Sequence, residues 1–238
     1  MDEWREQAFH GGRQTVGITR IGDTVRRPRH ARSDFVHALL RHLKAADFDG
    51  APRLLGIDEH GREVLAYING ETIDNSPARF SDARLVSAVR LIRRFHDTTA
   101  GTALAAAQEI VAHGDLGPHN IVFNGDTAVA IIDWKDDVAP GSRLVDFAHA
   151  VWSCADVCEP DIPVAEQARK VRLMCDAYGW DDASDLIDEI ADRFQRARDD
   201  HAAHEHPKAV AVFDEMIAWM ERHAPELKAA ADVDTADD

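Results

Sequence analysis

The sequence contains no long hydrophobic segment. None of its apolar runs approaches the roughly 20 residues that a membrane-spanning helix needs. The first residues, MDEWREQAF, also lack the basic segment and the apolar stretch of a secretory signal. We therefore expect a cytoplasmic protein that has no membrane partner.

Cysteine is scarce as well. The three cysteines, Cys154, Cys158 and Cys175, are an odd number, and all of them lie in sequence of helical character. This pattern disfavours a disulfide framework, and a Cys-x3-Cys pair without a nearby histidine is a poor zinc site. We expect these residues to act as small apolar groups in the core.

Positive charge is in short supply. The chain has 27 Lys and Arg against 43 Asp and Glu, which gives a formal net charge of −16. Such a protein repels phosphate backbones and anionic lipid surfaces, so we expect no nucleic acid partner. The charge suits a cationic small substrate, although by itself it is better explained by an acidic protein surface.

The 238 residues are enough to bury a core as one large domain or as two lobes. Alternating apolar residues over 15–21 and 24–27, joined at Gly22-Asp23, predict a β-hairpin. A helix is predicted over 33–47, and a second hairpin over 53–68. From about residue 81 the apolar spacing is mostly helical.

These patterns predict three parts of the chain. Residues 1–68 are expected to form a small β-rich lobe with one helix, and residues 69–225 a larger helical lobe. Residues 226–238 form an acidic tail that we expect to be disordered. The seam between the lobes is the natural place for a ligand cleft. The oligomeric state is left open.

A polar loop, HGDLGPHN, is interrupted by glycine and proline and ends at Asn120. Two apolar runs, 121–123 and 128–132, follow this loop and are joined by a turn, which predicts a hairpin. The hairpin returns the chain so that Asp133, at the end of the second run, emerges beside Asn120.

This arrangement suits the transfer of a phosphoryl group. The reaction needs a divalent cation at the phosphate oxygens and a carboxylate that orients the attacking hydroxyl and accepts its proton. Mg²⁺ requires from the protein little more than one carboxylate and one amide oxygen. Asp115, Asn120 and Asp133 provide these groups. Each of them alone would be an ordinary turn or strand end, but their order and both spacings together favour the chemistry.

Three segments, HGDLGPHN, IIDW and GSRLVDFAHAVW, resemble the aminoglycoside phosphotransferase family. This family belongs to a protein-kinase-like superfamily that also contains choline, homoserine and methylthioribose kinases. The resemblance implies an α+β, two-lobed protein-kinase-like fold, with a small antiparallel β-rich N-lobe and a larger, mainly helical C-lobe. It also implies transfer of the γ-phosphoryl group of ATP or GTP, with Mg²⁺, to a hydroxyl of a small molecule.

The resemblance assigns roles at matching positions. Asp115 would be the catalytic base, and Asn120 and Asp133 would be the Mg²⁺ ligands. His113 would brace the loop, and Asp146 would tie the loop to the following helix.

The nucleotide-binding part departs from the family pattern. Gly11 and Gly12 offer a shortened phosphate turn, and the crossing at Ala66, Tyr67 and Ile68 would offer backbone groups to the purine. At the position of the strand lysine the chain has arginine: we favour Arg27, which shares a strand face with Val25, and Arg26 is a close second.

The helix that should supply a glutamate partner to this cation contains none. It offers only Asp34, which is better explained as a capping residue, and His37. The missing ion pair leaves a second function open, in which the protein is a catalytically weak or idle nucleotide-binding or interaction module.

The acceptor is expected to be small and cationic, such as an aminoglycoside or an amino alcohol. Carboxylates are frequent in the part of the chain that should face it, and they would attract a cation. These acids are Asp136, Asp137, Asp156, Glu159, Asp161, Asp199, Asp200, Glu205, Asp214, Glu215 and Glu221. The tryptophans of this part are better explained by core packing than by a cation–π site.

Two further histidines are assigned structural roles. His119 is expected to pack or to face solvent, and His96 to lie at a helix end, where its charge suits the helix dipole.

Overall fold

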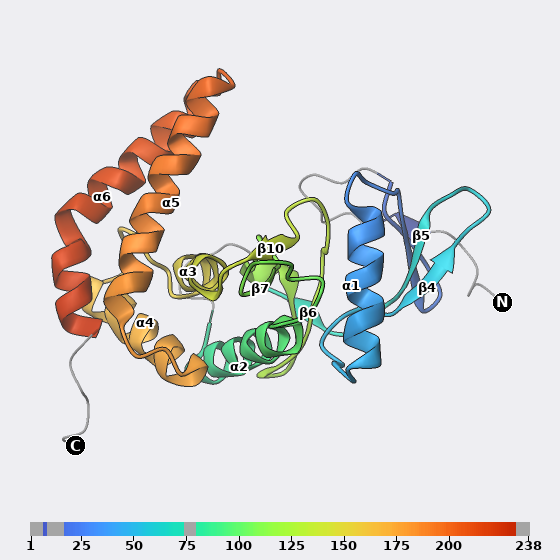
Figure 1. Ribbon diagram of the computed structural model, residues 1–238. Coiled ribbons are helices and arrows are strands. Elements are labelled where there is room, and N and C mark those ends of the chain that lie inside the picture. The colour runs from blue at the N-terminus through green and yellow to red at the C-terminus, as the bar shows by residue number, and fades with distance from the viewer. Residues whose placement is uncertain (1–6, 9–16, 74–79, 232–238) are drawn as a thin grey trace.

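The computed structural model describes residues 7–8, 17–73 and 80–231 (Figure 1). The first lobe is built on one antiparallel sheet with the strand order β1-β2-β3-β5-β4. Its strands are β1 (Gln7–Ala8), β2 (Thr19–Ile21), β3 (Thr24–Arg27), β4 (Leu54–Ile57) and β5 (Glu63–Ala66). The predicted hairpins are present as β2–β3 and β4–β5.

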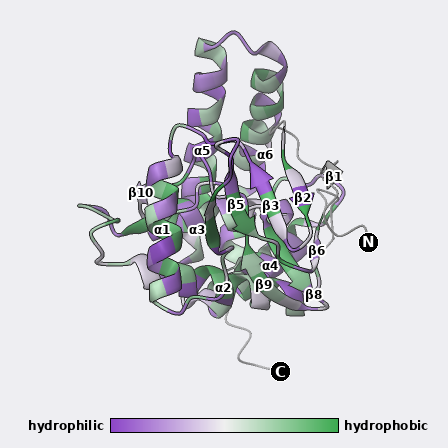
Figure 2. Ribbon diagram, turned by 90° about the vertical axis from the view of Figure 1, so that its right-hand side faces the viewer, coloured by the Kyte–Doolittle hydropathy of each residue, from purple (hydrophilic) through white to green (hydrophobic). Residues whose placement is uncertain are grey.

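One helix, α1 (Ser33–Ala45), lies beside this sheet (Figure 2). It buries Val36, Leu39, Leu40 and Leu43, whose spacing of three and four residues places them on a single helix face. The opposite face carries most of the polar residues.

The second lobe is mainly helical. Its helices are α2 (Asp82–Thr99), α3 (Arg143–Cys154), α4 (Val164–Tyr178), α5 (Ala183–Ala203) and α6 (Pro207–Ala231). Ser81, Ser142 and Asp182 cap the N-termini of α2, α3 and α5 by accepting hydrogen bonds from backbone amides. Helices α5 and α6 form a long hairpin that projects from the rest of the lobe (Figure 1).

Short strands lie between the N-lobe sheet and these helices (Figure 1). They are β6 (Glu71–Thr72), β7 (Ile110–Ala112), β8 (Ile121–Asn124), β9 (Thr127–Ile131) and β10 (Ala139–Gly141). Strands β6, β8 and β9 form one sheet, and β10 pairs with β7. A short 3₁₀ turn, η1 (Pro118–Asn120), precedes β8.

The C-terminal helix runs further than the sequence predicts. Helix α6 continues to Ala231, and both Leu227 and Ala231 are fully buried in the core. Residues 226–231 are therefore helix and not tail, because their apolar side chains pack against the lobe. Residues 232–238 lie outside the described residues.

The cysteines are all free, and Cys154 and Cys175 are buried. Burial raises the pKa of Cys158 to about 12, so its thiol stays protonated and unreactive. Across the described ranges, no helix combines the length and the hydrophobicity needed to cross a membrane.

Candidate active site

The loop after β7 is held by one buried carboxylate. Asp146, in the first turn of α3, accepts hydrogen bonds from the backbone amides of His113 and Gly114, both at 2.8 Å. His96 adds a third contact at 3.0 Å. Burial favours the protonated form, but these partners outweigh it and hold the pKa of Asp146 below its ordinary value. The carboxylate thus fastens the loop to the helix.

His113 braces the loop from inside and is only 1% exposed. Its Nδ1 is 3.3 Å from the amide of Asp115, and its Nε2 is 2.9 Å from the carbonyl of Ile132. Both contacts fit a single neutral tautomer, in which Nδ1 accepts and Nε2–H donates. Burial lowers the pKa of His113, which favours this neutral form. The contacts suit a structural group better than a proton acceptor.

Asp115 lies at the centre of the loop, and its side chain is 28% exposed. Asn120 donates from Nδ2 to Asp115 Oδ2 at 3.0 Å and to the Asp115 carbonyl at 2.8 Å. His119 and His149 lie on either side of the carboxylate, with Nε2 at 3.5 and 3.7 Å. The hydrogen bond with His119, opposed by burial and assisted by the charge of His149, holds the pKa of Asp115 well below its usual range. Asp115 is therefore ionised and can accept a proton.

The β8–β9 hairpin brings the third group to the same edge. Ile121 is paired with Ile131, and the amide of Ile132 donates to the carbonyl of Asn120 at 2.8 Å. Asp133 follows directly, with a left-handed backbone (φ 64°) that is uncommon for a residue other than glycine. The structure thus brings Asp115, Asn120 and the chain at Asp133 together, as the spacing predicts.

The oxygens at this edge fit a magnesium ion. Asn120 uses its amide NH₂ on Asp115, so its Oδ1 has no partner within the described chain. The Asp133 carboxylate already faces a positive charge, since Lys135 Nζ lies 2.6 Å from Oδ2. In the parts of the chain that the structure covers, no three His, Cys, Asp or Glu side chains cluster as a metal cage. Mg²⁺ prefers oxygen ligands and usually keeps several waters. One carboxylate and one amide oxygen from the protein, completed by phosphate and water oxygens, suit this preference.

The structure corrects the prediction for the donor side. The sequence predicts no carboxylate partner for Arg27 on the helix, but the structure shows one on a strand. The partner is Glu63 of the neighbouring strand β5, which is paired directly with Arg27 in the sheet. Arg27 Nε lies 2.5 Å from Glu63 Oε2. Glu63 is fully buried and also accepts from Ser33 Oγ at 2.6 Å and contacts His37 Nε2 at 2.8 Å. Helix α1 therefore reaches the ion pair through a serine and a histidine.

Charge and hydrogen bonding keep this glutamate ionised. Burial alone would raise the pKa of Glu63, but the hydrogen bond from Ser33 and the charge of Arg27 lower it below the ordinary value. Arg27 is 6% exposed, and its Nη2 is buried without a partner among the described residues. One donor group of the guanidinium is thus left over for another acceptor.

The other predicted donor-site residues are less well placed. Arg26 donates to Thr24 Oγ1 at 2.5 Å and lies 3.8 Å from Asp58, on the strand face opposite Arg27. The amide of Ala66 donates to Arg53, and the amide of Tyr67 to Asp23. Ile68, the third residue of the predicted crossing, forms no backbone hydrogen bond with another described residue. Gly11 and Gly12 lie outside the described residues.

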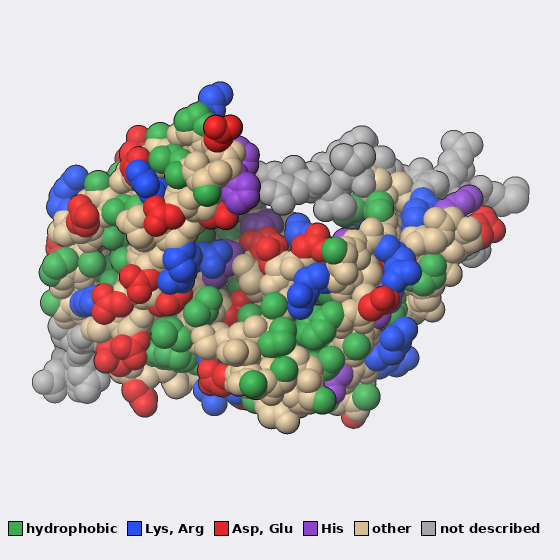
Figure 3. Space-filling model, turned by 45° about the horizontal axis from the view of Figure 1, so that its top comes forward, with side chains coloured by type: hydrophobic (Ala, Val, Ile, Leu, Met, Phe, Trp, Pro, Cys, Tyr) green, Lys and Arg blue, Asp and Glu red, His purple; other side chains and the backbone are tan. Residues whose placement is uncertain are grey.

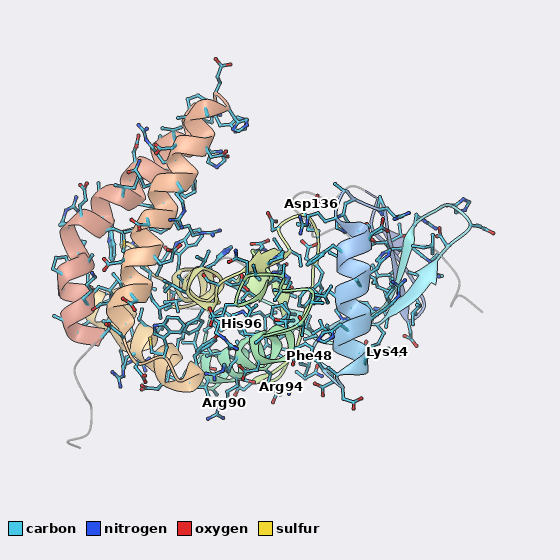
Figure 4. All side chains as sticks on the ribbon, viewed as in Figure 1. Lys44, Phe48, Arg90, Arg94, His96 and Asp136 are labelled. Carbon is cyan, nitrogen blue, oxygen red and sulfur yellow. The ribbon has the colours of Figure 1, made fainter. Side chains whose placement is uncertain are left out.

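His96 lies in the last turn of α2, as predicted, but its side chain is buried in the core. It is fully buried, with Nε2 on Asp146 and Nδ1 2.7 Å from Tyr178 Oη (Figure 4). Burial raises the pKa of Tyr178 to about 12, so its hydroxyl stays protonated and can donate to Nδ1. Helical periodicity would have placed His96 on the buried face of α2, beside Ile92 and Phe95.

The loop after Asp133 touches the N-lobe. Asp136 Oδ1 lies 2.9 Å from His30 Nδ1, and Figure 4 shows Asp136 on the loop next to α1. His30 is also 4.0 Å from Glu63, the partner of Arg27. The contact joins the predicted metal loop to the predicted donor lobe. Asp136 therefore has a partner within the chain, a role that the sequence left undecided.

His149 was not singled out from the sequence. It lies on α3, is 6% exposed, and its Nδ1 donates to the carbonyl of Gly114 at 2.9 Å. Burial is the main cause that lowers its pKa to about 4, and the charge of Arg193 lowers it further. A histidine within an amphipathic helix gives no sequence signal of this contact, because the contact depends on how α3 packs against the loop.

The low pKa of His149 makes stability depend on pH. An unfolded histidine binds a proton near pH 6.5, whereas folded His149 binds one only near pH 4. Lowering the pH through this window therefore favours the unfolded chain by roughly 3 kcal/mol. When the pH is lowered from 6.5 to 4, the free energy of unfolding should therefore fall less in His149→Gln than in the native protein. Urea unfolding at both pH values measures these free energies, and His60→Gln, at an exposed histidine, is the control. An equal fall in the native protein and both variants would contradict the low pKa of His149.

These observations define the class of the protein. A five-stranded antiparallel lobe, a helical lobe and an Asp–Asn–Asp edge between them make a protein-kinase-like α+β fold. The sequence matches the model of the phosphotransferase enzyme family over residues 36–182, more than half of its length, and the chain belongs to this family. The predicted family and fold are confirmed.

Known proteins agree with this assignment. The trifolitoxin immunity protein of Rhizobium leguminosarum bv. trifolii is 35% identical over 192 residues, which cover 71% of this chain and 72% of that protein. The GDP complex of aminoglycoside 2'-phosphotransferase-IIIa has a TM-score of 0.64 at 11% identity, over 92% of this chain and 93% of the other. An aminoglycoside phosphotransferase from Streptomyces rimosus, bound to ADP and streptomycin, has a TM-score of 0.56 at 15% identity, over 70% and 85%. These two structures share the fold.

Proposed function

We propose that this protein transfers the γ-phosphoryl group of ATP or GTP to a hydroxyl group of a small molecule. The observation that carries the proposal is the ionised Asp115 carboxylate, held by Asn120 at the edge to which the hairpin returns Asp133. Membership of a phosphotransferase family supports it. The nucleotides in the solved structures of similar fold, GDP and ADP, support a nucleotide donor.

The proposed reaction is a direct displacement at phosphorus. The hydroxyl oxygen of the acceptor forms a bond to the γ-phosphorus, and the bond from that phosphorus to the bridging oxygen breaks. The nucleoside diphosphate leaves with the electron pair of the broken bond, and Asp115 accepts the hydroxyl proton. Mg²⁺, when bound, would neutralise charge on the phosphate oxygens, and Asn120 and Asp133 are the residues that would hold it.

Arg27 is the proposed cation of the donor site. Glu63 fixes the guanidinium through Nε, and the spare Nη2 can bind a phosphate oxygen. Gly11 and Gly12 would supply the turn over the phosphates, and Ile68 a backbone contact for the purine. Arg26 remains the second choice because it is paired on the other strand face.

A second function is favoured by one observation. The ammonium of Lys135 already neutralises Asp133, so the edge could be stable without a metal ion, as in an idle nucleotide-binding or interaction module. The similarity to an immunity protein fits either function, because immunity could follow from modifying a toxic compound or from binding it.

The first test is a thermal-shift measurement with ATP and GTP, each with and without Mg²⁺. A ligand at 100 times its Kd stabilises the folded state by about 2.7 kcal/mol, which for a chain of this size is roughly 5–10 °C. We expect such a shift with one nucleotide, larger with Mg²⁺. Transfer of labelled γ-phosphate to hydroxyl compounds then separates the two functions. The absence of a shift with either nucleotide would overturn the phosphotransferase function and nucleotide binding, and would leave only an interaction module.

A further inference from the structure

The acceptor side of the loop is bounded by a row of side chains that runs from Asp115 across α3 to α5. His149 Nε2 lies 3.7 Å from Asp115, and the His149 ring is stacked on Trp152 with centroids 5.5 Å apart. The guanidinium of Arg193 lies 5.9 Å from the centroid of the same tryptophan. The ring of Trp152 also packs edge-on against Phe194, which fixes α5 against α3. Arg193 is thus joined to the predicted catalytic base by only two intervening side chains.

This arginine differs from its neighbours on α5. Arg196 is paired with Glu189, and Arg198 Nε lies 3.0 Å from Asp214. Arg193 forms no hydrogen bond and no ion pair with any residue that the structure describes, and it is partly buried. Burial lowers the pKa of its guanidinium, although the charges of Asp146 and Asp115 oppose the change. A half-buried, unpaired guanidinium is costly, and an anion that pairs with it would remove the cost.

Several of the carboxylates that should attract a cation already have partners. Asp156 is fully paired with Lys170 at 2.6 Å in the core, and Asp136 contacts His30. Asp200 lies 3.5 Å from His204, and Asp214 contacts Arg198. These four acids therefore offer a bound amine less free charge than the net charge of the chain suggests, and the net charge alone does not identify a cationic acceptor.

The acceptor side of Asp115 is lined by nitrogen-bearing side chains. Figure 3 shows a hollow between the α5–α6 hairpin and the rest of the molecule, with histidine, Arg or Lys, and Asp or Glu side chains at its wall. Close to the reacting carboxylate, the identified neighbours are two histidines and, behind them, Arg193.

We propose that the hydroxyl acceptor carries an oxyanion, a carboxylate or a phosphate, that pairs with the Arg193 guanidinium while its hydroxyl faces Asp115. The planar fork of arginine binds both oxygens of such a group and fixes its orientation as well as its charge. Trp152, on which the guanidinium rests, would hold the fork in place. The inference rests on the phosphotransferase function proposed above, and it replaces a cationic acceptor by an acidic alcohol.

The test uses the full chain with Mg²⁺ and ATP and a matched series of three-carbon alcohols. Glycerate carries a carboxylate, glycerol 3-phosphate a phosphate, glycerol no charge, and serinol an ammonium group. We expect phosphoryl transfer and binding to favour the two oxyanions. Arg193→Met should raise the KM for them about 10- to 100-fold with little change in kcat, the loss expected for one charge-assisted bidentate contact. Arg193→Lys, which keeps the charge but not the fork, should lie between.

Arg196→Met is the matched control, because it removes the same charge from the same helix at a site already paired with Glu189. It should leave the KM unchanged. A direct readout is the side-chain Nε–H resonance of Arg193, assigned by its loss in Arg193→Met, during titration with glycerate, glycerol 3-phosphate and serinol. Circular dichroism and the nucleotide thermal shift verify that each variant is folded.

The outcomes separate the two proposals. The acceptor inference is overturned, and the phosphotransferase function stands, if the Arg193 resonance responds to neither oxyanion. The same conclusion follows if serinol is phosphorylated faster than glycerate and the KM for glycerate is the same in Arg193→Met as in the native protein. If the resonance responds to oxyanions but the nucleotides bind without any transfer, the function fails and the anion site remains.

Discussion

Replacement of Asp115 by asparagine should reduce kcat by about 10²- to 10⁴-fold, the contribution of a general base. The carboxylate is ionised and lies between His119, His149 and Asn120, so it is the group at this edge that can receive a proton. Asparagine has the same shape, and its side-chain oxygen can still accept the hydrogen bond from Asn120. The fold and the nucleotide thermal shift should therefore be retained.

The measurement is single-turnover transfer of labelled γ-phosphate, together with nucleotide binding by thermal shift. Asp126→Asn is the control: this acid lies at the exposed tip of the β8–β9 hairpin, near Arg84 and far along the hairpin from Asp133. It should turn over at the native rate. A variant at Asp115 that keeps the native kcat would remove the proposed base from the reaction.

The second large effect is expected at Glu63. Glu63→Gln leaves the charge of Arg27, only 6% exposed, without a counter-charge. Breaking a buried ion pair from one side costs about 3–5 kcal/mol of unfolding free energy. Arg27 also loses the group that fixes its orientation, so the affinity for ATP or GTP should fall.

A double variant makes this prediction specific. In Glu63→Gln combined with Arg27→Met, both charges are absent, and we expect most of the lost stability to return while nucleotide affinity stays low. Chemical unfolding and nucleotide titration measure the two quantities. Glu59→Gln, an exposed glutamate in the β4–β5 turn, is the matched control. Equal destabilisation by the Glu59 and Glu63 variants would show that the ion pair contributes little.

The sequence was informative where the signal is local. The apolar residues alternate in the β2–β3 hairpin and form two continuous runs in the β8–β9 hairpin. In both hairpins the two segments are joined at a Gly turn, and this pattern predicts the strands and the return of the chain to Asp133 beside Asn120. The spacing of Asp115 and Asn120 within one loop fixes them close together whatever the rest of the chain does. These local constraints account for the confirmed fold and family.

The partner of Arg27 shows where local reasoning stops. A glutamate was sought within the helix 33–47, but the pairing depends on the register between β3 and β5, which lie 36 residues apart at Arg27 and Glu63. No hairpin turn joins β3 to β5, so turn geometry does not fix their register, and the pairing depends on the packing of the whole lobe. The same holds for His30, which meets Asp136 only because the two lobes touch.

By itself, the sequence determined the order of the chemical groups, the hairpin that gathers them and the family to which the chain belongs, because short-range geometry leaves those features little freedom. The tertiary structure decided which charges are already paired. Asp156 is bound to Lys170 in the core, whereas Arg193 lies over Trp152 and has no ion-pair partner among the described residues. Net charge counts all of these groups alike, and only helix packing separates those that cancel within the protein from those that remain for a ligand.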